Sequence, residues 1–229
     1  MSDLRVEEFL RIVHRYYPAD VPPGTNPGGS DRPPSAPTSE LQHWQETWAQ
    51  ALENEPWVLL RNALQREFPG HELGTYTPAY HSACYTCIVY LPLPASGQQR
   101  LRVAGAISLL APVYLVYGTE ENIPVEHAER DQHLERALDE LPGSGPWEEH
   151  FARFRHAISP AQQLHLHPTE KMQPTATVIA QVIERMLGHR RFPIEMARIP
   201  VPGIHVPYLP AEEPTLLGAL FSANLASLP

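Results

Sequence analysis

Apolar residues recur with helical spacing near the start of the sequence, which predicts a helix over residues 1–17. Residues 18–39 follow, and they are rich in proline, glycine and serine with few side chains to bury. We interpret them as an extended linker that joins the first helix to a single domain formed by residues 40–229. The apolar positions at i, i+3, i+4 and i+7 of the first helix are Phe9, Ile12, Val13 and Tyr16.

Two further helices are predicted between residues 39 and 70. Ser39 and Gln42 fit the S-x-x-Q capping box that begins a helix. Pro56 suits the first turn of the second helix, and Gly70 is placed to end it. The apolar stripe of the first helix is Leu41, Trp44, Trp48, Ala51 and Leu52, and that of the second is Trp57, Leu60, Leu64 and Phe68.

The apolar pattern changes between residues 85 and 118, where short runs of β-branched and aromatic residues predict strands. The runs are YTCIVYLPL, RLRVAGAISLL and PVYLVYG, with the hairpin-length loop ASGQQ between the first two. We expect an antiparallel meander of these three strands, which a strand near Leu73–Thr77 would extend.

Helices are predicted again after the strands, at residues 124–141, 147–158 and 175–187, with a short final helix in TLLGALFSANL. Residues 159–173 are predicted to be a loop, and the proline-rich stretch before the final helix to be extended. The predicted fold class is therefore α+β, a small antiparallel sheet of three to five strands packed with several helices.

Composition narrows the class of protein. The 229 residues include 26 prolines, which predict many breaks in regular structure, and two cysteines, too few for a disulfide scaffold. The sequence has no run of 18 apolar residues and no apolar core of signal-peptide length near its start, so we expect a cytoplasmic protein that does not span a membrane.

Negative charge is concentrated in one segment. The net charge of −9 argues against a general nucleic-acid-binding surface. Residues 120–149 contain ten acidic residues against two arginines, which is almost the whole imbalance. Such a patch either steers a basic protein partner or only keeps the surface solvated. The candidate partner contacts are Glu120, Glu121, Glu126, Glu129, Asp131, Asp139 and Glu140.

The stretch HSACYTC contains the C-x-x-C spacing of redox pairs and zinc sites. It runs directly into a predicted strand, where residues three apart point to opposite faces. We therefore interpret both cysteines as small buried apolar residues. The alternative is a zinc site, although no complete ligand pattern is present. Its ligands would be His81, Cys84 and Cys87 with His165 or His167.

Other catalytic signatures do not assemble. The sequence has no G-x-S-x-G elbow and no P-loop, so we assign no catalytic residue and no cofactor. The basic cluster in GHRRFPIE follows the helix predicted at residues 175–187, where cations interact favourably with the helix dipole.

Two stretches carry a resemblance to a known class. They are SLLAPVYLVYGTE and GHRRFPIEMARIPVPGIHV, the latter followed by TLLGALFSANL. This layout resembles bacterial immunity-type proteins, the small cytoplasmic antidotes encoded beside secreted or transferred toxins. The matching positions are Ser108 to Tyr117, Arg191 to Pro193, Val201-Pro202 and Thr215 to Phe221.

The resemblance implies a non-enzymatic protein that binds and neutralises a cognate toxin. The acidic segment is then the expected contact surface, since many toxins that act on nucleic acid are basic. Two alternatives stay open: a zinc-dependent enzyme that uses the histidine and cysteine site, and a scaffold or adaptor that recruits a partner through its first helix and linker.

Overall fold

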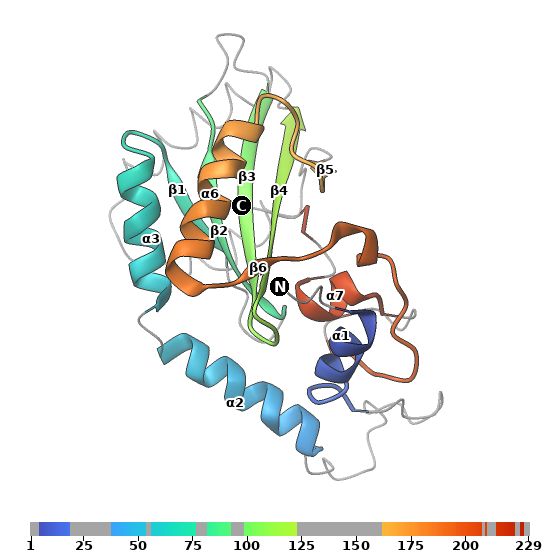
Figure 1. Cartoon of the computed structure of the whole chain (residues 1–229). Helices are drawn as coiled ribbons and strands as arrows, with labels where there is room; N and C mark the ends of the chain where they lie inside the picture. Colours follow the sequence, from blue (N-terminus) through green and yellow to red (C-terminus); the bar gives the residue numbers. More distant parts are fainter. Residues whose placement is uncertain are drawn as a thin grey trace, which may run out of the picture.

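A mixed six-stranded sheet forms the centre of the molecule (Figure 1). The computed structural model describes residues 5–18, 38–53, 56–76, 82–92, 99–122, 162–207, 209, 214–222 and 225–226. The strand order is β1-β2-β3-β4-β5, all antiparallel, and β6 pairs in parallel with β4. The strands are β1 Leu73–Tyr76, β2 Cys84–Tyr90, β3 Gln99–Ser108, β4 Val113–Asn122, β5 Gln162–His165 and β6 Arg190–Arg191.

The α+β class is confirmed, but the sheet is larger than the predicted three to five strands. The expected meander is β2, β3 and β4, and β1 extends it as anticipated. β5 lies in residues predicted to be a loop, and β6 lies in the basic cluster after the long helix. Both strands are short and pair with the edge of β4 left open by β3. Their own side chains carry no alternating apolar pattern, so the sequence gives no local sign of them.

Side chains alternate between two apolar layers, one on each face of the sheet. On one face, Cys84, Ile88 and Ala104 pack with residues of α1, α2, α7 and the segment before α7. On the other, Cys87 and Val103 pack with residues of α3 and α6, and Figure 1 shows α6 crossing in front of the central strands and α3 beside β1. The helices are α1 Val6–Val13, α2 Ser39–Glu53, α3 Pro56–Glu67, α6 Gln173–Leu187 and α7 Leu216–Leu220.

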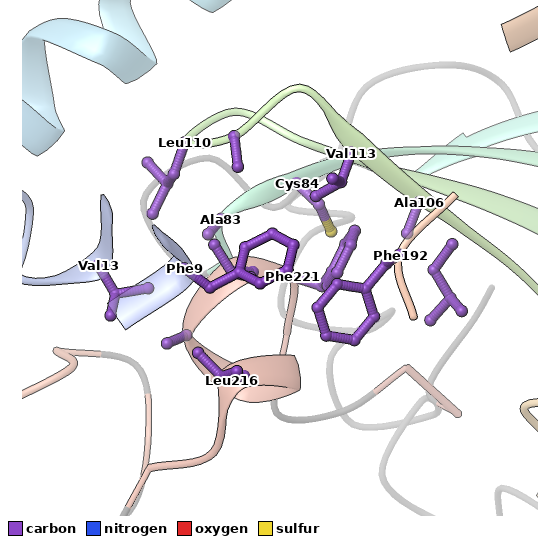
Figure 2. Packing of buried hydrophobic residues seen from close by; sticks show 14 of the residues in the cluster. Phe9, Val13, Ala83, Cys84, Ala106, Leu110, Val113, Phe192, Leu216 and Phe221 are labelled. Carbon is purple, nitrogen blue, oxygen red and sulfur yellow. The ribbon is translucent and has the colours of Figure 1, made fainter. Parts of the chain in front are cut away.

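The first helix packs inside this core. Phe9 is fully buried and lies edge-on to Phe192, which lies edge-on to Phe221, with ring centroids 5.4 Å apart in each pair (Figure 2). The Tyr17 hydroxyl donates a hydrogen bond of 2.8 Å to the carbonyl of Ala219. The apolar face of α1 is therefore occupied by the chain's own C-terminal elements. The helix is shorter than predicted and ends at Val13.

Three local predictions meet different outcomes. α2 begins at Ser39 as predicted, but the hydroxyl of Thr38 accepts a hydrogen bond from Leu41 N–H, so Thr38 caps the helix and the capping role predicted for Ser39 is wrong. Leu52, predicted to belong to the buried stripe of α2, is 56% exposed. Gly188 ends α6 with a φ of 65°, as its position after Leu187 suggested.

Two further expectations concern membranes and the middle of the chain. No helix in the described part of the chain is long and apolar enough to cross a membrane. The helices predicted at residues 124–141 and 147–158 lie outside the described residues.

Candidate functional site

The two cysteines of CYTC lie on opposite faces of β2. Cys84 belongs to the layer with α1 and α7, and Cys87 to the layer with α3 and α6. Burial raises the pKa of Cys84 to about 11 and the pKa of Cys87 to about 12. A reactive thiol needs a lowered pKa and access to solvent, whereas both of these thiols have a raised pKa and are buried. This geometry supports the structural interpretation of both cysteines.

The zinc-site alternative finds no support in the positions of its ligands. His165 on β5 is opposite Gly118 of β4, whereas Cys87 is two strands further across the sheet beside Gly105 of β3. Three strand spacings place these side chains ~14 Å apart, whereas zinc ligands lie ~2 Å from the metal. Within the described ranges, no group of three or more histidine, cysteine, aspartate or glutamate side chains could hold a metal ion. His167 is exposed, and His81 lies outside the described residues.

A network of charged and polar side chains occupies the end of the sheet where β3 begins and β4 ends. We call it the stem cluster, because it contains the first two residues of the acidic segment, Glu120 and Glu121, and the rest of the segment follows it in the sequence. Its members come from three neighbouring strands and divide between the two faces of the sheet. They are Gln99, Arg100 and Arg102 of β3, Glu120 and Glu121 of β4, and His165 of β5.

Arg102 and Glu121 form the buried part of the stem cluster. Arg102 is 1% exposed and Glu121 is 7% exposed, and the Arg102 Nη2 donates to Glu121 Oε2. Arg100 approaches the same carboxylate oxygen at 3.7 Å from the solvent side. The guanidinium of Arg102 also lies 5.8 Å from the ring centroid of Tyr90, within cation–π range. A charge buried at this depth is retained only when it is paired in this way.

Glu120 makes the contacts of the stem cluster on the other face of the sheet. Its Oε1 accepts a hydrogen bond of 2.6 Å from the side chain of Gln99, and its Oε2 lies 3.5 Å from Nε2 of His165. Glu121 therefore links β4 to β3 on one face of the sheet, and Glu120 links β4 to both β3 and β5 on the other. Glu120 and Glu121, two of the predicted partner contacts, have partners within their own chain.

The stem cluster holds the two strand ends that flank the acidic segment. Glu121 pairs with Gln162 across β4 and β5, so the end of β4 and the start of β5 lie at adjacent positions of the sheet. The remaining predicted partner contacts, Glu126, Glu129, Asp131, Asp139 and Glu140, lie outside the described residues. The described residues thus define where this segment is attached.

The sequence reasoning missed Arg102, although a signal for it was present. In RLRVAGAIS, alternation places Arg102 on the same face as Ala104 and Ala106, which are small buried residues. A charged residue at such a position means either that the strand is wrongly assigned or that the residue belongs to a buried ion pair. The acidic residue that pairs with it comes from the next strand, which only the hairpin register reveals.

Comparisons with protein-family models, with curated proteins and with solved structures find no match to this chain.

Proposed function

We propose that this chain is a non-enzymatic cytoplasmic immunity-type protein that binds and neutralises a cognate toxin through its acidic segment. The observation that carries the proposal is the attachment of this segment. Its two ends are adjacent strands, β4 and β5, paired at Glu121 and Gln162 and held by the stem cluster. Residues 126–149, which contain eight acidic residues and two arginines, belong to the segment between these two strand ends.

This arrangement favours a protein partner with a basic surface. Charge gathered at one end of a molecule steers an oppositely charged partner and raises its association rate by ~10- to 1000-fold at low salt. Glu121 is committed to Arg102 inside the fold, so we assign the partner contacts to the acids from Glu126 onward. Both cysteines are free thiols, in keeping with the proposed cytoplasmic location.

The first experiment tests whether the chain is an antidote. The product of the neighbouring gene is expressed alone and together with this chain, and growth and co-purification are measured. We expect toxicity alone, normal growth with this chain, and a complex of the two proteins. Normal growth without this chain, or toxicity that persists beside it with no complex formed, would overturn the proposal.

The second experiment tests the contact surface. The variant Glu129→Lys/Asp139→Lys should associate with the toxin more slowly, and its association rate should depend less on salt. The control Glu170→Lys/Glu195→Lys makes the same change in net charge at exposed residues elsewhere in the fold. Equal slowing in both variants would show that only net charge matters and that the acidic segment is not the contact surface.

A further inference from the structure

Four side chains form a continuous row across the sheet at the stem cluster. Tyr90 of β2 is opposite Arg102 of β3, Arg102 is opposite Thr119 of β4, and Thr119 is opposite Leu164 of β5. Because directly opposite residues share a face, all four side chains project from the same side of the sheet. Arg102 and Thr119 are therefore immediate neighbours, with an aromatic side chain on one side of the pair and an aliphatic one on the other.

Arg102 and Thr119 contain buried polar atoms that lack hydrogen-bond partners. Arg102 is 1% exposed and Thr119 is fully buried. Among the residues that the structure describes, Arg102 Nε and Nη1 and Thr119 Oγ1 have no partner. Leaving such groups unsatisfied is unfavourable, and more so for a charged group than for a neutral one. Two guanidinium nitrogens and one hydroxyl group are thus left without hydrogen bonds on neighbouring residues.

Two arginines share one carboxylate in the same region. Arg100 and Arg102 both pair with the carboxylate of Glu121, which is the only ion-pair partner of either arginine within the described ranges. Glu120 is on the opposite face of the sheet, where it is bonded to Gln99. Two guanidinium groups thus share one carboxylate beside the unused donors.

We propose that Arg102 and Thr119 bind a small oxyanion, the carboxylate or phosphate group of a small molecule. A planar guanidinium suits such groups because it presents several donors in fixed directions. The hydroxyl of Thr119 supplies a further donor from the adjacent strand. Arg100, two residues along β3 on the same face, has a side chain that is 37% exposed, so the site lies close to solvent. This site is independent of the proposed toxin contact.

The test is a calorimetric titration of the full chain with inorganic phosphate and, separately, with acetate at constant ionic strength. The main variant is Thr119→Val, which keeps the shape of the side chain and removes only the hydroxyl. We expect the wild-type chain to bind one equivalent of at least one probe, and Thr119→Val to bind it about tenfold more weakly. Arg102→Lys, which keeps the charge but replaces the whole guanidinium by one ammonium group, should weaken binding at least as much. The control Thr75→Val alters an exposed threonine on β1 and should bind like the wild type.

The stability of Thr119→Val without anion gives a second readout. If its hydroxyl has no partner within the chain, this variant should unfold at the same temperature as the wild type or higher, which also shows that it is folded. Phosphate binding without acetate binding would assign a phosphate ligand, and binding of both would assign a general oxyanion site. The proposal is overturned if neither probe binds, if Thr119→Val binds as tightly as the wild type, or if its unfolding temperature falls.

Discussion

The side chains of Cys84 and Cys87 belong to opposite faces of the sheet, although the two residues are only three positions apart on β2. Cys84 Sγ lies 3.7 Å from Thr86 Oγ1, and Cys87 Sγ donates to the Gly105 carbonyl at 3.4 Å. The C-x-x-C spacing, which brings two thiols together at the start of a helix, separates them on a strand.

Both thiols are expected to react with a water-soluble thiol reagent only after the protein unfolds. The thiolate is the reactive form, and burial raises the pKa of Cys84 to about 11 and that of Cys87 to about 12. At pH 8 we therefore expect negligible modification of the native protein and two equivalents in guanidinium chloride. Rapid modification of either cysteine in the native protein would contradict the assignment.

The same pKa shifts predict a loss of stability in alkali. The thiols of the unfolded chain ionise near 9.0, whereas those of the folded chain stay protonated to higher pH. Above pH 9 the unfolded state therefore binds fewer protons, so the free energy of unfolding should decrease as the pH rises from 9 toward 12. Urea unfolding between pH 7.5 and 10.5 measures this decrease. Cys84→Ala/Cys87→Ala should show a shallower slope, with a remainder from Tyr85, whose pKa burial raises to about 12.

Phe9→Ala should destabilise the whole protein and not only its first helix. The side chain is fully buried against Phe192, so its removal leaves a cavity that costs ~3–5 kcal/mol. Arg11→Ala, an exposed change on the same helix, should cost less than ~0.5 kcal/mol. Chemical unfolding followed by circular dichroism distinguishes the two. Similar values for both variants would mean that α1 is not part of the core.

Gly105→Ala should destabilise the contact between the sheet and α6. A Cβ at this position would lie 2.8 Å from Ile179 Cγ2 and 2.9 Å from Ile183 Cδ1, so we expect a loss of ~1–3 kcal/mol. Ile183→Val removes the second of these atoms. The double variant should therefore lose less stability than the sum of the single changes. Ile88→Val, on the opposite face, is the control and should add to Gly105→Ala without compensation.

The buried ion pair should respond to mutation far more strongly than an exposed one. Arg102→Met leaves Glu121 buried with only the partial support of Arg100, and we expect a loss of ~3 kcal/mol or more. Arg185→Met breaks the exposed pair with Glu67, which lies at 2.9 Å, and should cost less than ~1 kcal/mol. Adding Glu121→Leu to Arg102→Met should restore part of the loss. Equal losses of stability in Arg102→Met and Arg185→Met would mean that the pair of Arg102 and Glu121 is exposed to solvent.

Local patterns in the sequence account for most of the fold. Alternation and β-branched residues predict β2, β3 and β4, and a strong apolar stripe with Gly188 predicts α6, because each signal lies within one element. β5 and β6 form instead because they pair with the open edge of β4, and no local pattern of residues predicts that pairing. Leu52 has the spacing of a buried residue, but it is 56% exposed next to the last residue of α2, although Ala51 before it is buried.

The stem cluster was less predictable than the strands that carry it. The alternation of β3 identifies Arg102 as buried, but its partner Glu121 is 19 residues away and was counted among the surface acids. The pairing depends on the register of the hairpin, which the apolar pattern alone does not determine. The interpretation of the cysteines needed no such long-range information, since the direction of strand side chains was enough.

The contact between α1 and α7 has a consequence for the order in which the protein folds during synthesis. Tyr17 and Ala219 are 202 positions apart, and Phe9 is buried against Phe192 and alongside Phe221. A ribosome adds residues from the N-terminus onward, so α1 emerges long before the surface that buries it has been made. Until residues 216–221 leave the ribosome, the apolar side chains of α1 cannot make their native contacts. An isolated segment of eight residues is too short to form a stable helix in water, so residues 6–13 stay an exposed apolar segment until then, and chaperones that recognise such segments are expected to bind there.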